Sequence, residues 1–232
     1  MCRLFRRKSV SLPLLCCWGW DRGARKGAVL CLVAGCPVPA RGETFAWWRE
    51  EKNQFISINT MFAKETYVQR RAALKKRIGS GVLLFLGNDE QGLNYEDNAF
   101  RYRQDSTFLY YFGLSAAGLS AIIDVDEDRE IIFGDELSID YIVWMGTQPT
   151  LRDKAGLVGV TDVRPAAEVA AYLRQAAGAG RAVHYLPPYR AEHRLKLMDW
   201  LGLAPGCQEG SVPFIRAVVA QRNVKSEEEI AE

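Results

Sequence analysis

The stretch FRYRQDSTFLYYFGL, residues 100–114, places aromatic side chains on both sides of a short polar run that comprises Arg103, Gln104, Asp105 and Ser106. Burying an unpaired charge is costly, so these polar groups must be solvated or paired. Because Arg103 and Asp105 stand two residues apart on a segment that we predict to be extended, their side chains should project to the same face. We therefore expect structural anchors covered by the aromatic side chains. An interface role and direct catalysis are the alternatives.

Outward from this stretch, the composition is that of a globular protein, with 48% hydrophobic and 25% charged residues among 232. Residues 1–60 carry 10 lysines and arginines against 4 acidic residues, and the rest of the chain carries 20 against 24. This acidic body shows no basic face, so we expect no nucleic-acid partner. The body has a single cysteine, Cys207, which excludes an internal disulfide there and favours a cytoplasmic protein.

The first sixty residues differ from the rest, since they hold five of the six cysteines and lack sustained periodicity. Their apolar runs are shorter than the roughly 20 residues of a membrane-spanning helix, and we expect no membrane partner. We interpret 1–60 as a disordered or spurious extension, with Met61 as the natural start. The alternative is an exported lipoprotein with residues 1–36 as its signal, because VAGC at 33–36 resembles a cleavage box with Cys36 as the acylated residue.

From Met61 onward, apolar runs bounded by glycine or proline alternate with helical segments. An acidic turn at 126–128 between two β-rich runs indicates a hairpin, so the sheet should be mixed. The fold class is therefore α/β, a mixed β-sheet flanked by α-helices. A capping-box pattern, Ser226 with Glu229, starts a further helix near the end. We predict helices over 64–78, 165–177, 192–201 and from 226, and strands over 81–87, 121–125, 130–133, 141–146 and 181–187.

The usual catalytic patterns are missing from the sequence. It contains neither a glycine-rich phosphate loop nor a Gly-x-Ser-x-Gly elbow. Cys207 has no neighbouring histidine, and His184 and His193 lack metal-ligand spacing, so we expect both histidines to be core or surface residues. We predict no catalytic residue and no metal ligand in this chain. A distinct hydrolase is the weaker hypothesis, and it would use Asp135, Glu136, Asp140 and His184.

The run YRQDSTFLYYFGL, 102–114, resembles the N-terminal domain of Xaa-Pro aminopeptidase (aminopeptidase P), of the creatinase or "pita-bread" metallopeptidase family. Phe112 departs from the pattern, because a small hydroxyl residue is commoner there. The segment 67–87 resembles the family's start, YIVWMG at 141–146 its Trp-x-Gly turn, and 218–232, with Arg222, the passage into its catalytic domain. The resemblance covers 61–232. The matching residues are Tyr102, Arg103, Gln104, Asp105, Ser106, Phe108, Tyr110, Tyr111 and Gly113.

This resemblance implies that 61–222 is the N-terminal domain and that 223–232 starts a linker helix into a catalytic domain missing from this chain. That domain is expected to bind two divalent cations, typically manganese, through two Asp, one His and two Glu. The metals would generate the hydroxide that cleaves before proline. The chain alone should then be inactive. Its partners would be its own catalytic domain, proline-containing peptides and further copies in a tetramer or dimer.

The resemblance also implies roles for individual residues. Trp144 would reach the active-site mouth of a neighbouring subunit, where its flat apolar face suits a substrate proline or side chain. The structural motif would consist of Arg103, Gln104, Asp105, Ser106 and Phe108. Two other functions stay open: a stand-alone interaction module derived from the same family, and the N-terminal domain of a creatinase-type amidinohydrolase, which shares the two-domain plan.

Overall fold

The computed structural model describes residues 61–95, 98–206 and 209–231. The predictions for 1–60, including the signal ending at Cys36, and the prediction for Cys207 lie outside these residues. Among the described helices, none has the length and apolar character needed to cross a membrane.

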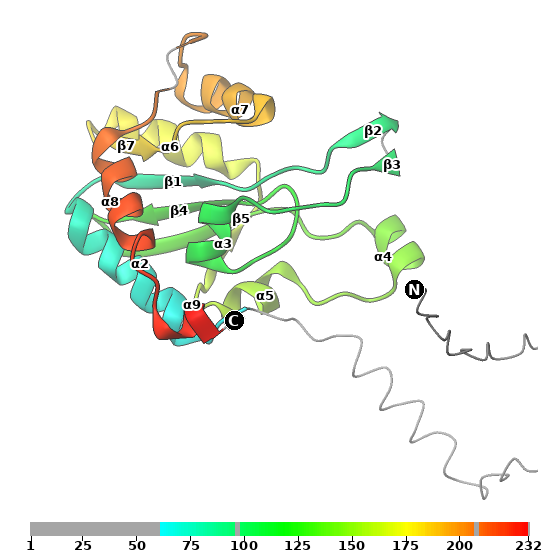
Figure 1. Cartoon of the computed structure of the whole chain (residues 1–232). Helices are drawn as coiled ribbons and strands as arrows, with labels where there is room; N and C mark the ends of the chain where they lie inside the picture. Colours follow the sequence, from blue (N-terminus) through cyan, green and yellow to red (C-terminus); the bar gives the residue numbers. More distant parts are fainter. Residues whose placement is uncertain (1–60, 96–97, 207–208, 232) are drawn as a thin grey trace, which may run out of the picture. The chain divides into compact units, whose positions relative to one another are not determined.

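The centre of the fold is a five-stranded sheet with the strand order β6-β5-β4-β1-β7 (Figure 1). Strand β1 (Val82–Leu86) pairs antiparallel with β4 (Ser120–Asp124) and parallel with β7 (Val183–Tyr185). Strand β5 (Arg129–Phe133) pairs antiparallel with β4 and parallel with β6 (Asp162–Arg164). The sheet is therefore mixed, as predicted, and the predicted hairpin is the β4–β5 pair.

Helices cover both faces of this sheet and complete the predicted α/β class (Figure 1). Side chains alternate along each strand, so Leu83 and Phe85 of β1 enter one core cluster while Val82 and Leu84 enter the other. The first cluster is covered by α2 (Lys64–Ile78), α3 (Ser106–Phe112), α5 (Leu151–Leu157) and α8 (Val212–Arg222), and the second by α6 (Glu168–Gly178) and α7 (Ala191–Leu201).

Helix α2 ends where the sequence predicts, because Gly79 follows it with φ 86° and donates its N–H to Lys75 O. Arg71 of this helix is fully buried. Its Nε donates to Glu130 at 2.6 Å, and its other nitrogens donate to the carbonyl oxygens of Tyr111 and Val158, each at 2.8 Å. Burial lowers the pKa of the Arg71 guanidinium, while Glu130 opposes that shift. One buried cation thus ties α2 to α3, β5 and the end of α5.

Two smaller elements extend beyond the layered core on the same side of Figure 1. One is the hairpin of β2 (Gly92–Tyr95) and β3 (Asn98–Ala99), and the other is α4 (Ile139–Met145). The predicted extended piece at 141–146 is wrong, since it lies mainly in α4. Its β-branched residues favour a strand by propensity, but a strand needs a paired neighbour. The helix instead satisfies its backbone locally, with Ile142 N–H donating to Ser138 O at 3.1 Å.

The C-terminal part also follows the sequence pattern closely. Helix α9 (Glu227–Ala231) starts at the predicted capping box. Ser226 N–H donates to the Glu229 carboxylate at 3.0 Å, and Glu229 N–H donates to the Ser226 hydroxyl at 3.3 Å. The predicted helix opened by Pro165 begins later, at Glu168, because Ala166 and Ala167 form a turn, and Gly178 is its last residue rather than a residue beyond its end.

Candidate functional site

The polar run of the opening stretch leads directly into helix α3. Asp105 is the N-cap residue, and its Oδ1 accepts hydrogen bonds from Thr107 N–H at 2.8 Å and Phe108 N–H at 2.9 Å. Ser106 is the first helical residue and is exposed, whereas Phe108 is fully buried in the core. Capping satisfies donors that would otherwise lack partners at the start of a helix. The side chain of Asp105 thus stabilises the start of α3.

Gln104 is the buried centre of the cluster. Its side-chain oxygen accepts hydrogen bonds from the backbone N–H groups of Asn88 at 2.7 Å and Asp105 at 2.9 Å. Its side-chain nitrogen donates to Ala116 O at 2.7 Å. This one amide therefore joins the loop after β1, the start of α3 and the turn before β4. All these bonds go to backbone groups, which is how a side chain fixes loop geometry.

Asn88 and Tyr102 complete the same junction. The Asn88 side chain donates to Arg103 O at 2.8 Å. The Tyr102 hydroxyl lies 2.8 Å from Ala116 O and 3.2 Å from Asn88 O, so it donates into the pair of carbonyls. Burial raises the pKa of this hydroxyl, which keeps it protonated as a donor near neutral pH.

Arg103 departs from our expectation of a covered anchor. It is exposed, and its side chain lies 3.4 Å from the Ser106 hydroxyl rather than beside Asp105. The two side chains do not share a covered face, because Asp105 turns toward the first turn of α3. The anchor of the run is Gln104, the residue between them.

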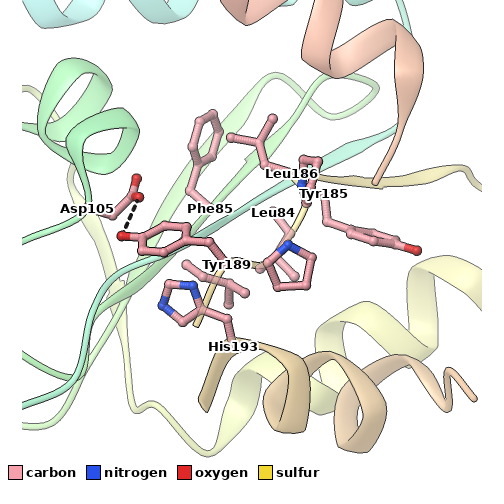
Figure 2. Close-up of a pocket in the computed structure, with 10 residues that line it drawn as sticks. Leu84, Phe85, Asp105, Tyr185, Leu186, Tyr189 and His193 are labelled. Atoms are coloured by element: carbon pink, nitrogen blue, oxygen red, sulfur yellow. Dashed lines mark hydrogen bonds between the residues drawn. The ribbon is translucent and has the colours of Figure 1, made fainter. Parts of the chain in front are cut away.

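Two residues that the sequence analysis did not connect with this run close the site from the α7 side (Figure 2). The Tyr189 hydroxyl lies 3.2 Å from Asp105 Oδ2 and 3.3 Å from Asn88 Oδ1. The ring of His193 stands edge-on to that of Tyr189, with 5.9 Å between centroids. A small pocket lies here, lined otherwise by apolar side chains and two prolines: Leu84, Phe85, Leu86, Tyr185, Leu186, Pro187 and Pro188.

His193 is a core histidine, as we expected for this residue. It is buried on α7, and its Nε2 lies 3.0 Å from Gly87 O, which accepts the hydrogen bond. Burial lowers the pKa of the imidazole, although the Gly87 carbonyl opposes that shift. A neutral imidazole that donates from Nε2 ties α7 to the end of β1.

The chemistry available at this site is that of a structural junction. The amide groups of Gln104 and Asn88 bind backbone, Asp105 caps a helix, and His193 holds a carbonyl group. No group of three or more His, Cys, Asp or Glu side chains in the described ranges is arranged to hold a metal ion. The arrangement positions loops at one end of the sheet.

The weaker hypothesis of a distinct hydrolase is wrong, because the fold separates its residues. His184 lies on β7 at one edge of the sheet, while Asp135 and Glu136 follow β5, and β4 and β1 lie between them. Asp135 accepts a hydrogen bond from Ala166 N–H at 3.1 Å, and Glu136 accepts one from Leu151 N–H at 3.1 Å. Both carboxylates thus serve nearby backbone groups.

Comparison with known proteins places this fold. The family model "Aminopeptidase P, N-terminal domain" matches residues 67–184, half of the chain. The chain belongs to this family. The resemblance stated from the run 102–114 is thereby confirmed.

Relatives of the aminopeptidase P N-terminal domain agree with this assignment. Xaa-Pro dipeptidase of Rattus norvegicus is 33% identical over 95 residues, covering 41% of this chain and 19% of that protein. The Homo sapiens Xaa-Pro dipeptidase is 28% identical over 97 residues, covering 41% of this chain and 20% of that protein. The chain thus spans about a fifth of the curated relatives that it matches.

Solved structures show the same fold. The aminopeptidase PepP of Pseudomonas aeruginosa superposes with a TM-score of 0.59 at 22% identity, covering 75% of this chain and 41% of that one. Aminopeptidase P from E. coli gives the same TM-score and identity, covering 73% of this chain and 41% of that one. At this identity the likeness concerns the fold.

In this aminopeptidase P N-terminal domain, Trp144 lies on α4, away from the polar junction. Its side chain is 86% exposed, and its neighbours Ile139 and Val143 are also exposed. Indole rings usually bury much of their surface, so the exposure of Trp144 beside exposed aliphatic side chains is unusual.

Proposed function

We propose that residues 61–222 are the non-catalytic N-terminal domain of a manganese-dependent Xaa-Pro aminopeptidase, which removes the residue preceding a proline. Membership of the aminopeptidase P N-terminal domain family carries this proposal. In it, residues 1–60 are an extension outside the fold, and residues 223–232 begin the connection to a catalytic domain. The single cysteine after residue 36 supports a cytoplasmic location.

The metal chemistry in this proposal belongs to the catalytic domain that would follow residue 232. The described residues of this chain gather no suitable ligand set, so the pair of manganese ions cannot be assigned to them. The contribution of this domain is to hold its loops rigid and to present its surface. The hydrogen bonds of Gln104 and Asp105 to backbone groups support such a scaffold role.

The surface that this domain would present is helix α4. We assign to it the shaping of the substrate entrance, with Trp144 reaching the active site of a neighbouring subunit in a dimer or tetramer. The exposure of Trp144, Val143 and Ile139 supports this role, because a free apolar helix face favours burial against protein or peptide.

A second candidate is an Xaa-Pro dipeptidase, and the curated relatives favour it, since they carry that name. The two activities differ in their substrates: a dipeptidase cleaves peptides that end at the proline, whereas an aminopeptidase cleaves peptides that continue beyond it. A dipeptide such as Ala-Pro and a tripeptide such as Ala-Pro-Ala therefore discriminate between them.

The test is to extend the reading frame past codon 232, express the product and assay both peptides with manganese. We expect cleavage of the Ala-Pro bond by the longer product and none by residues 61–232 alone. A longer product that binds manganese but cleaves neither peptide would overturn the proposal. Hydrolysis of the dipeptide Ala-Pro without hydrolysis of the tripeptide Ala-Pro-Ala would favour the dipeptidase.

Trp144→Ala tests the entrance separately. We expect kcat/KM for Xaa-Pro peptides to fall about tenfold, as the loss of one aromatic contact can cause. Unchanged kcat/KM in an oligomer of normal size would remove Trp144 from the substrate path.

A further inference from the structure

Arg70 on α2 has an unusual environment for a cation. The residue is 6% exposed, and its guanidinium carbon lies close to two aromatic rings, 4.4 Å from the Phe62 centroid and 4.0 Å from that of Tyr110. Its Nη1 donates to Tyr110 O at 3.0 Å. Its Nη2 is buried and has no hydrogen-bond partner. A buried cation with a free donor needs a nearby anion.

That anion is Glu229 of α9, the short helix that comes after α8. Glu229 Oε1 lies 3.5 Å from Arg70 Nη2, and the side chain of Glu229 is 11% exposed. The other carboxylate oxygen accepts from Ser226 N–H in the capping box. Glu229 thus joins the start of α9 to α2 through its two oxygens.

Electrostatic contacts rather than apolar burial hold α9 in this place. The helix has no buried residue, and its Ile230 is 74% exposed. The neighbouring Glu228 accepts a hydrogen bond from the Thr66 hydroxyl at 2.8 Å. Lys225 also faces Glu229, but at 4.0 Å and with a largely exposed side chain, so it contributes less.

The end of α8, the helix before α9, is also held by hydrogen bonds near Arg70. The Gln221 side chain donates to Arg70 O at 2.9 Å and accepts from the Tyr111 hydroxyl at 3.1 Å. Arg222 donates to the Thr107 hydroxyl at 2.9 Å. The end of α8 is therefore set against α2 and α3, and Arg70 lies where the chain turns into α9.

We infer that Arg70 is a positioning residue, which fixes the direction in which the chain leaves α8 by holding Glu229. Only the identity of a domain beyond residue 232 rests on the proposed function. The docking of α9 itself is a property of this chain, whether or not the longer protein cleaves peptides.

The test is hydrogen exchange at short labelling times on the 232-residue chain. Glu229→Gln keeps a side-chain oxygen for the capping box but removes the charge that faces Arg70. Glu227→Gln makes the same change on the same helix, without any ion pair between Glu227 and Arg70. We expect amide exchange over 226–231 to be about fivefold faster in Glu229→Gln, as for a segment held by few contacts, and nearly unchanged in Glu227→Gln.

A further variant identifies the cation. Lys225→Gln should leave the exchange of α9 close to that of the native chain, whereas Arg70→Met should reproduce Glu229→Gln. Equal exchange in Glu229→Gln and Glu227→Gln would overturn the inference. A Lys225→Gln effect as large as that of Glu229→Gln would assign the role to Lys225 instead. If Arg70→Met fails to fold, the comparison of Glu229→Gln with Glu227→Gln still tests whether the Glu229 carboxylate holds α9.

Discussion

The side-chain oxygen of Gln104 and the backbone N–H of Asn88, sixteen residues earlier in the chain, are joined by a buried 2.7 Å hydrogen bond. This bond and the two others of Gln104 satisfy backbone groups of three separate loops. Loops seldom contain regular backbone pairing, so a buried side-chain amide is one means of fixing them. Within the polar run of the opening stretch, Gln104 is therefore the residue that joins these loops.

Gln104→Ala should lower the free energy of unfolding by about 3 kcal/mol, since it leaves several buried backbone groups without partners. Urea denaturation measures this change. Arg103→Ala is the matched control, because Arg103 is exposed, and it should shift the free energy of unfolding by less than about 0.5 kcal/mol. Equal effects of the two substitutions would contradict the central role of Gln104.

Asp105 should matter as a helix cap. Asp105→Ala removes the acceptor for Thr107 and Phe108 N–H and should cost about 1 kcal/mol. Asp105→Asn keeps an oxygen in the same place and should recover most of that stability. Thermal unfolding followed by circular dichroism compares the two. If both variants lost the same stability, the bond from Tyr189, rather than the cap, would be the important contact.

The elements that were predicted correctly have local signals, whereas α3, α5, α8 and β6 were not predicted. Glycine after Ile78, the apolar run at 82–86 and the capping pattern at 226–229 each act within a few residues, and each gave the element found. Segment 141–146 misled the prediction, since its β-branched residues favour a strand, but the segment has no neighbouring strand to pair with and lies mainly in α4.

The candidate site was less predictable because it forms between distant segments. The sequence singled out the run 103–106, but it could not show that Gln104 is the buried member or that Asn88, Tyr189 and His193 surround it. Likewise, no local pattern reveals that Arg70 meets Glu229, because that contact depends on how α8 packs against α2.

The buried pair of Arg71 and Glu130 should be sensitive to loss of one partner. Glu130→Gln leaves a fully buried guanidinium without its counter-charge and should lower the free energy of unfolding by about 3 kcal/mol. Asp128→Asn makes the same chemical change in an exposed pair with Lys75 and should have little effect on the denaturation midpoint. A tolerated Glu130→Gln would show that the two backbone carbonyl groups suffice for Arg71.

Stability should decline with acidity before the carboxylates titrate, because burial lowers the pKa values of His193 and His184. Well above the ordinary histidine pKa of 6.5, both imidazoles are neutral in the folded and in the unfolded chain, so they do not lower the free energy of unfolding. Below it, the unfolded chain takes up protons that the folded chain does not, so stability falls until the lowered pKa is passed. His193→Gln should reduce the slope of the urea midpoint against pH between pH 7 and about 5.5. An unaltered slope in that variant would contradict this account, and His184→Gln reports the share of the second histidine.

The two described tryptophans should respond differently to truncation. Trp144 is 86% exposed on α4, while Trp200 on α7 packs against the second core cluster. Trp144→Ala should change the free energy of unfolding by less than about 0.5 kcal/mol, whereas Trp200→Ala should cost roughly 3 kcal/mol. Urea titrations of both variants measure the contrast. A large loss in Trp144→Ala would mean that this ring stabilises the isolated chain, and its exposure would no longer support a role in contacting substrate or a second subunit.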